Sequence, residues 1–210
     1  MKEYFITGTD TGVGKTLVSA ILTSVLNAQY WKPIQSGIAD EPSEQVILQQ
    51  LIDVSPDKLL QSVYSLDASL SPDQAARLQG IGIDFHQIIK PSVNNSIIVE
   101  GAGGVCVPIN NNYTMLDVME KLDMPVIVVT RGGLGTINHT LLTLEALRRC
   151  DLTIEGIVFS GDLNPDNQIA IETWGKVKTL FHVPYFHELN KNTLKHWLQQ
   201  NKELIRQQLI

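Results

Sequence analysis

Cysteines are scarce in this chain, and nothing in their placement indicates cross-links or a bound metal. Only Cys106 and Cys150 occur in 210 residues, far apart and outside any CxxC or Cys/His spacing. We therefore exclude a disulfide framework and a structural zinc site, and we expect two buried free thiols. The five histidines show neither ligand spacing nor a nucleophile triad, so we expect surface or structural roles for them. They are His86, His139, His182, His187 and His196.

Basic residues and long apolar runs are also few. The chain has 16 Lys and Arg against 22 Asp and Glu, a formal net charge of -6 at pH 7, and no visible basic cluster. Nucleic-acid binding depends on clustered Lys and Arg that neutralise phosphates, so we expect no nucleic-acid partner. No segment approaches the roughly 20 uninterrupted apolar residues of a membrane span. The opening MKEYFIT is too short for a signal-peptide core, so we expect a cytoplasmic protein without a membrane partner.

What the chain does have is a regular alternation of two apolar patterns. Strand-length apolar runs lie at 3–7, 30–34, 96–102, 125–130 and 154–159. Helix-period stretches lie at 15–28, 115–122, 136–150, 167–181 and 193–210. Runs such as SIIVE and PVIVVT are apolar throughout, which is typical of strands covered by helices on both faces. The alternation predicts an α/β fold in one domain over 1–210, with a parallel β-sheet flanked by helices in three αβα layers.

A glycine-rich turn, GTDTGVGKT, separates the first strand from the first helix. Gly8 and Gly14 bracket five residues, one more than in the common phosphate loop. Backbone N–H groups and a helix N-terminus converge on an anion in such a turn. Lys15 can then reach the β- and γ-phosphates, and the Thr16 hydroxyl can ligate Mg²⁺. We therefore predict a fold like that of phosphate-loop NTPases, with a nucleotide site formed by Gly8, Thr9, Asp10, Thr11, Gly12, Val13, Gly14, Lys15 and Thr16.

Other polar residues follow strands of the same predicted sheet. SIIVEGAGG ends a buried strand in Glu100, the layout of the acidic Mg²⁺ partner in phosphate-loop enzymes. Gly103 and Gly104 can add N–H donors for an anion. WKPIQSG places Lys32 at the end of another strand, where an ordinary solvated lysine is the alternative. The carboxyl ends of the strands are where such sheets bind ligands.

Two further stretches have a structural explanation beside a functional one. In SPDQAARLQG, Ser71 can cap a helix, Pro72 suits its first position and Gln74 completes a capping box. GGLGTINHTLLT is a glycine loop that opens a helix. Its N–H groups either bind a carboxylate or form a tight turn, and the residues alone do not separate the two.

Taken in order, GTDTGVGKT, KPIQSG, SP before a helix, VEGAGG and GLGTINH resemble the dethiobiotin synthetase family over residues 3–190. The longer phosphate loop followed by Lys-Pro-x-x-Ser-Gly makes the match specific. The resemblance implies an ATP-dependent ligase of biotin biosynthesis. Its substrate, 7,8-diaminononanoate (7,8-diaminopelargonate), takes up CO₂ as a carbamate, and ATP converts the carbamate into a carbamic-phosphoric anhydride. The neighbouring amine then closes the ureido ring, releasing phosphate beside ADP. Mg²⁺ and a homodimer with the substrate site at its interface are also implied.

The resemblance further implies roles for individual residues. Candidate catalytic residues are Thr11, Lys15 and Lys32. Candidate substrate contacts are Thr11, Lys32, Ser36, Ser71, Pro72, Gly103 and Gly104, joined across the interface by Gly135, Thr136, Ile137 and Asn138. Candidate Mg²⁺ ligands are Thr16, Glu44 and Glu100. Candidate nucleotide contacts outside the loop are Glu100, Gly103, Ser160, Pro184 and Tyr185.

The chain departs from the family pattern at two places. Glu44 in SEQV stands where an aspartate is usual on the helix after the Ser-Gly element, and Asp40 or Glu41 could serve as the metal ligand instead. Ser160 and Gly161 stand where the family often reads adenine with an asparagine. An amide both donates and accepts, so its absence leaves the base preference open.

Two other functions remain as alternatives to the ligase. A switch ATPase that binds a macromolecular partner would share the phosphate loop, but Asp10 stands where that subclass carries a signature lysine. An amide-forming ligase acting on a larger carboxylate would need an ammonia-producing domain with a cysteine nucleophile, for which the chain is too short.

Overall fold

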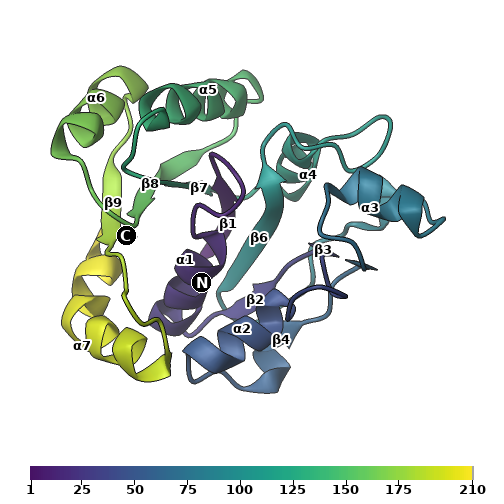
Figure 1. The fold of residues 1–210 in the computed structure, drawn as a ribbon, viewed down its shortest axis with the longest axis horizontal. Helices are drawn as coiled ribbons and strands as arrows, with labels where there is room; N and C mark the ends of the chain where they lie inside the picture. Colours follow the sequence, from purple (N-terminus) through teal and green to yellow (C-terminus); the bar gives the residue numbers. More distant parts are fainter. Residues whose placement is uncertain (210) are drawn as a thin grey trace.

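The computed structural model describes residues 1–209, and its centre is a seven-stranded sheet in the order β4-β2-β6-β1-β7-β8-β9 (Figure 1). Its strands are β1 (Glu3–Gly8), β2 (Gln29–Trp31), β4 (Leu59–Leu60), β6 (Ile97–Gly104), β7 (Val126–Thr130), β8 (Ile154–Ser160) and β9 (Thr179–Val183). A small second sheet pairs β3 (Ile34–Ser36) with β5 (Tyr64–Leu66). These strand pairs are parallel, so the carboxyl ends of the strands meet at one edge.

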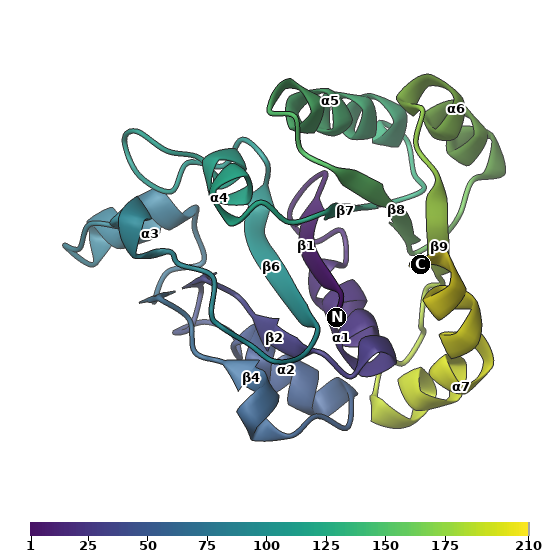
Figure 2. The same ribbon diagram turned by 180° about the vertical axis from the view of Figure 1, so that it is seen from behind.

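Helices cover both faces of the main sheet (Figures 1 and 2). One buried cluster joins Tyr4 and Ile6 of β1 to one set of helices. These are α1 (Lys15–Leu26), α2 (Glu44–Leu51) and α7 (Lys191–Gln208). Phe5 points to the other face, as the two-residue period of a strand requires. The helices there are α3 (Pro72–Leu78), α4 (Met115–Leu122), α5 (Thr136–Arg149) and α6 (Pro165–Gly175). Two single turns, η1 (Pro56–Lys58) and η2 (Phe85–Gln87), complete the elements. The predicted three-layer α/β fold is confirmed.

The strand predicted at 30–34 is divided into two. β2 ends at Trp31, and β3 begins at Ile34 in the small sheet. Pro33, between them, has no N–H to donate to a neighbouring strand and restricts the residue before it to extended backbone. The chain therefore leaves the main sheet here, which brings Lys32 to the sheet edge.

The helix predicted at 167–181 was wrong in its second half. α6 ends at Gly175, and Lys176 adopts the left-handed region at a φ of 45°. The chain then continues as the edge strand β9, whose TLFHV sequence includes the β-branched and aromatic residues that favour strands. The helical spacing of apolar residues continues past Gly175, so a prediction from spacing alone combined α6 and β9 into one helix.

Three smaller expectations also change. α7 begins at Lys191, after a capping box at Asn190, and residue 210 lies outside the described part of the chain. Ser71 precedes α3, but its hydroxyl donates to Asp73 Oδ1 (2.6 Å) and caps no backbone N–H, so the predicted capping box is absent. Both cysteines are free, as predicted, but Cys106 is exposed and Cys150 only half-buried.

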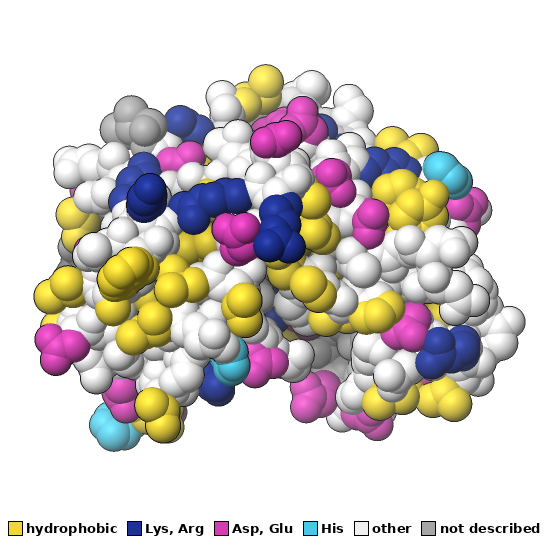
Figure 3. All heavy atoms as spheres, turned by 90° about the horizontal axis from the view of Figure 1, so that it is seen from above, with side chains coloured by type: hydrophobic (Ala, Val, Ile, Leu, Met, Phe, Trp, Pro, Cys, Tyr) yellow, Lys and Arg dark blue, Asp and Glu magenta, His cyan; other side chains and the backbone are white. Residues whose placement is uncertain are grey.

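Charged side chains of both signs lie together on the surface. On the face shown in Figure 3, Lys and Arg are interspersed with Asp, Glu and hydrophobic side chains. Exposed ion pairs in the described part of the chain include Arg149 with Glu145 (3.2 Å). Within residues 1–209, none of the helices has both the length and the apolar character to cross a membrane.

Candidate functional site

The predicted phosphate loop lies between β1 and α1, at the carboxyl edge of the sheet. Gly12 and Gly14 have φ values of 73° and 97°, a region that glycine enters without steric cost. At Gly8, an added Cβ would lie 2.7 Å from Val13 Cγ2 and 3.1 Å from the Asp10 carbonyl oxygen. The loop therefore folds closely over the end of β1, and these glycines are the residues that permit the turn.

Lys15 is the first residue of α1 and is buried beside this loop. Its Nζ donates to the Asp10 carbonyl oxygen at 2.9 Å. Burial lowers the pKa of Lys15, and the nearby Glu100 carboxylate opposes that shift only in part. A lysine ammonium carries three donors, so Lys15 keeps donors for a phosphate beyond its bond to the loop.

Four predicted site residues from four different segments form one connected polar cluster: Thr16, Lys32, Glu44 and Glu100. Thr16 Oγ1 donates to Glu100 Oε1 at 3.0 Å, and Lys32 Nζ donates to the same oxygen at 3.3 Å. Lys32 also forms an ion pair with Glu44 Oε1. The other Glu100 oxygen, Oε2, accepts a hydrogen bond from the hydroxyl of Tyr30 at 3.0 Å. Tyr30 was missed from the sequence because its apolar strand setting gives no sign of a polar partner.

The carboxylates in this cluster raise the pKa of both Lys32 and Tyr30. Burial lowers the pKa of Lys32, but the carboxylates of Glu100 and Glu44 outweigh it, and the net pKa is raised. Burial, and then the charge of Glu100, raise the pKa of Tyr30 well above its usual value. At neutral pH, Lys32 is therefore a cation and Tyr30 a neutral donor.

The oxygen donors here fit a divalent metal of the Mg²⁺ class. Mg²⁺ binds through hard oxygen ligands, often one or two carboxylates supplemented by phosphates and water, and Thr16, Glu44 and Glu100 offer a hydroxyl and two carboxylates. Glu44 Oε2 is buried and has no hydrogen-bond partner in the described chain, which makes it an available ligand atom. Of the alternatives, Asp40 accepts from the Ser69 backbone N–H (3.3 Å) and Glu41 is exposed. Glu44 is the one that meets Glu100 through Lys32.

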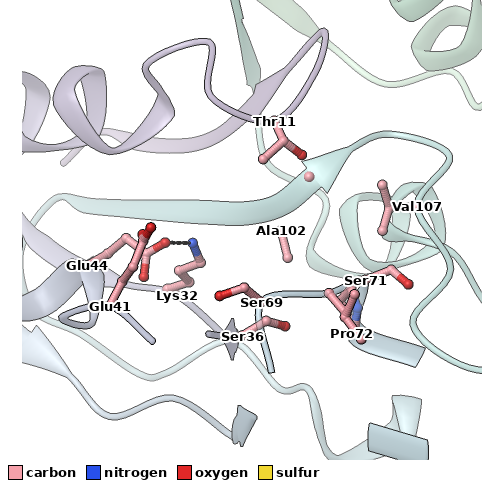
Figure 4. A pocket seen from close by; sticks show the side chains of 12 residues that line it. Thr11, Lys32, Ser36, Glu41, Glu44, Ser69, Ser71, Pro72, Ala102 and Val107 are labelled. Carbon is pink, nitrogen blue, oxygen red and sulfur yellow. Dashed lines mark hydrogen bonds and ion pairs between the residues drawn. The ribbon is translucent and has the colours of Figure 1, made fainter. Parts of the chain in front are cut away.

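A cavity of about 370 Å³ adjoins this cluster (Figure 4). Its predicted lining residues are Thr11, Lys32, Ser36, Ser71, Pro72 and Gly103, together with Glu41 and Glu44. Residues not singled out from the sequence also line it: Ser69, Leu70, Ala102 and Val107. The Ser36 hydroxyl is buried without a partner in the described chain, so a polar ligand could satisfy it. The cavity connects the phosphate loop at Thr11 to Lys32, with both charged and apolar walls.

Other predicted substrate residues lie away from this cavity. Gly104 lines a second hollow of about 510 Å³, whose lining also includes Thr9, Thr11 and Leu142 of α5. The loop before α5 does not line the first cavity. Of the predicted contacts, only Gly135 belongs to this loop; Thr136, Ile137 and Asn138 form the first turn of α5 and do not line the cavity either. Thr136 is buried, while Gly135 and Asn138 are exposed.

The predicted base-contacting segments lie side by side at the ends of β8 and β9. An added Cβ on Gly14 would lie 2.4 Å from Ser160 Oγ, so Ser160 lies directly against the phosphate loop. The Gly161 N–H donates to the Val183 carbonyl oxygen at 2.9 Å, which links this segment to Pro184 and Tyr185. Tyr185 is 64% exposed, so its ring is open to a ligand or to solvent.

Comparisons of the sequence with known proteins identify the family, and comparisons with solved structures show the fold. A family model described as an AAA domain matches residues 2–193. The ATP-dependent dethiobiotin synthetase BioD of Novosphingobium aromaticivorans is 43% identical over 194 residues, covering 92% of this chain and 93% of that protein. A biotin biosynthesis bifunctional protein BioCD of Bordetella avium is 42% identical over 93% of this chain, which spans 42% of that longer protein. Among solved structures, the MinC:MinD cell division protein complex of Aquifex aeolicus superposes with a TM-score of 0.61 at 16% identity, over 99% of this chain and 95% of that one.

Proposed function

The chain belongs to the ATP-dependent dethiobiotin synthetase family, and we propose that it forms the ureido ring of dethiobiotin from 7,8-diaminononanoate, CO₂ and ATP. The observation that carries the proposal is the 370 Å³ cavity that joins Thr11 of the phosphate loop to Lys32. A diamine carbamate in this cavity would lie beside the nucleotide's terminal phosphate. Such proximity converts the transfer into an effectively unimolecular step.

The carbamate forms when one amine adds to the carbon of CO₂ and loses a proton, and the reaction then proceeds from the carbamate in two balanced steps. A carbamate oxygen attacks the γ-phosphorus of ATP, the bond to the bridging oxygen breaks, and ADP leaves. The second amine then attacks the carbamoyl carbon of the mixed anhydride, losing a proton as phosphate departs. The first step brings together two anions, so the site must supply positive charge where the phosphoryl group moves.

The chain's own residues supply much of that charge. Lys15 at the start of α1 donates to the β- and γ-phosphates, and the backbone from Gly8 to Gly14 surrounds them. Lys32 and the Thr11 hydroxyl bind the carbamate, while Ser36, Ser71 and Pro72 form the wall for the carbon chain. Thr16, Glu44 and Glu100 are the proposed Mg²⁺ ligands. Mg²⁺, when bound, would neutralise charge on the phosphate oxygens.

Loss of activity in two lysine variants tests this assignment. We expect phosphate release from Mg²⁺-ATP and bicarbonate to depend on added 7,8-diaminononanoate. Lys15→Ala and Lys32→Ala should each abolish this diamine-stimulated phosphate release. Lys90→Ala is the matched control, because Lys90 is a surface lysine paired with Glu3 at 2.7 Å, and it should leave the rate unchanged. ATP hydrolysis at the same rate with and without the diamine would contradict the proposed ligase activity and favour a switch ATPase.

We also propose that the working enzyme is a homodimer in which residues 135–138 of one copy bind the distal carboxylate of substrate held by the other. Gly135 caps α5 and residues 136–138 form its first turn, in which Gly135 and Asn138 are exposed; the neighbours Leu134 and Leu142 are 99% and 61% exposed. Free N–H groups at a helix N-terminus suit a carboxylate.

Subunit mixing tests the shared site. Lys32→Ala and Gly135→Asp are each expected to be inactive alone, since the second introduces negative charge and strain at a φ of 88°. Random dimers of the two would restore about a quarter of the wild-type rate, because half the dimers are mixed and each has one intact site. No recovery from mixed dimers would place the whole site within one chain.

A further inference from the structure

The two oxygens of Glu100 have different surroundings. Oε1 faces the phosphate loop and accepts from Thr16 and Lys32, at 3.0 and 3.3 Å. Oε2 faces the sheet interior and accepts from the Tyr30 hydroxyl at 3.0 Å. Glu100 is 1% exposed and Tyr30 is fully buried, so water does not substitute for this bond. The Tyr30 hydroxyl thus binds the Glu100 oxygen that lies away from the phosphate loop.

The sheet register explains why Tyr30 reaches this oxygen. β2 and β6 are parallel neighbours, with Tyr30 opposite Ile98. Glu100 lies two residues further along β6, and therefore on the same face as Tyr30 and Ile98. Diagonal neighbours on one face are within reach of an aromatic side chain. The Tyr30 ring packs in the buried cluster that includes α1 and Ile98, so its hydroxyl has little freedom to point elsewhere.

We propose that Tyr30 is a positioning residue, which fixes the rotation of the Glu100 carboxylate so that Oε1 is presented to the nucleotide-bound metal. The inference rests on the proposed function only in requiring a metal-nucleotide site at Glu100. A carboxylate held by one donor on the far oxygen keeps the near oxygen directed at the loop. Outer partners of this kind set the orientation and basicity of metal ligands.

The same contact also has a purely structural explanation, in which the phenol merely satisfies a buried carboxylate. The chain offers a matched control for it. Tyr4 is likewise buried in the sheet core on the same face, and its hydroxyl donates to the Leu209 carbonyl oxygen at 3.0 Å, on α7's side of the cluster. Tyr30→Phe and Tyr4→Phe each remove one buried hydroxyl with a hydrogen bond, but only the first touches Glu100.

The test measures nucleotide binding as a function of Mg²⁺, without the diamine. Binding of fluorescent N-methylanthraniloyl-ADP is followed in EDTA and then as Mg²⁺ is added, for the wild type and both variants. We expect Tyr30→Phe to raise the Mg²⁺ concentration for half-maximal binding on the order of tenfold. Its affinity for the nucleotide in EDTA should be unchanged, and Tyr4→Phe should match the wild type in both measurements.

Two results would overturn the inference: a Mg²⁺ half-saturation in Tyr30→Phe within about twofold of the wild type, or an equal shift in Tyr4→Phe. If Tyr30→Phe does not fold, Tyr30→Met removes the same hydroxyl and fills the space with an adaptable apolar chain. The readout is independent of turnover. If the wild type binds Mg²⁺-nucleotide but its phosphate release does not respond to the diamine, the proposed reaction is contradicted. The comparison of Tyr30→Phe with Tyr4→Phe remains valid.

Discussion

Replacing Lys32 by methionine should lower the free energy of unfolding, because the Lys32 ammonium offsets the repulsion between the carboxylates of Glu44 and Glu100. The side chains of Lys32, Glu100 and Glu44 are 7%, 1% and 18% exposed. Without the ammonium the two carboxylates lose their shared cation, although Thr16 and Tyr30 still donate to Glu100. Removing one partner of a buried ion pair costs roughly 3–5 kcal/mol. Because Glu100 keeps two hydrogen bonds and the Glu44 side chain is 18% exposed, less buried than Glu100, we expect the low end, about 3 kcal/mol.

Urea unfolding in EDTA measures this loss directly, and in a chain of this size it corresponds to a fall in Tm of about 6–12 °C. The pH dependence follows from the raised pKa of Lys32. A raised lysine pKa gives stabilisation that is complete below the unfolded value of about 10.4 and is lost only as the pH rises through the folded value. The deficit of Lys32→Met should therefore be constant across the neutral range.

Added Mg²⁺ should stabilise Lys32→Met more than the wild type, because the freed carboxylate oxygens then lack a competing cation. Lys90→Met, which breaks an exposed pair with Glu3, is the control and should cost less than about 1 kcal/mol. A free energy of unfolding for Lys32→Met within about 1 kcal/mol of the wild type would refute the reasoning. Lys32 would then contribute no more than a surface lysine.

Three further predictions concern other parts of the fold. Gly14→Ala combines a left-handed φ of 97° with a Cβ 2.4 Å from Ser160 Oγ. We expect strain of about 1–3 kcal/mol and at least tenfold weaker nucleotide binding by titration, with an unchanged circular dichroism spectrum. Burial, helped by Glu155, raises the pKa of Tyr4 to about 12. Since the unfolded value is about 10, the wild type should lose about 1.4 kcal/mol of stability per pH unit more than Tyr4→Phe does between these two pH values, measured by urea titrations at both ends. Ser160→Asn should increase the preference for ATP over other nucleoside triphosphates in the phosphate-release assay by roughly tenfold, the value of one added hydrogen bond; an unchanged preference would separate Ser160 from base recognition.

Local patterns predicted the phosphate loop and most of the helices. α4 spans Met115–Leu122, the range expected from its apolar spacing, and the loop glycines have the conformations that their motif requires. These features depend on a few consecutive residues. The very short strands β4 and β5 were missed, because segments of two or three residues have no detectable period and form only where a neighbouring strand is available.

Contacts between segments distant in sequence could be predicted only in part. The family resemblance predicted one site for Glu44, Glu100 and Lys32, but it did not indicate that Lys32 would bridge the two carboxylates. The bond from Tyr30 to Glu100 depends on the register of β2 against β6, which a sequence of apolar residues does not specify. A shift of one residue would turn the tyrosine to the opposite face.

The two site lysines differ in a way that suits different tasks in the proposed reaction. Lys15 has a lowered pKa, since burial outweighs its partners and its ammonium donates to a neutral carbonyl oxygen. Its charge is therefore incompletely compensated, and an arriving polyphosphate would be its first close anionic partner in the loop. Lys32 has a raised pKa because two carboxylates already compensate it. The two carboxylates occupy two of its three donors, so one N–H of Lys32 remains for a carbamate while the ion pairs hold the ammonium in place. The fold thus keeps one lysine ready to attract the nucleotide and holds the other in place, as a charged donor at the wall of the substrate cavity.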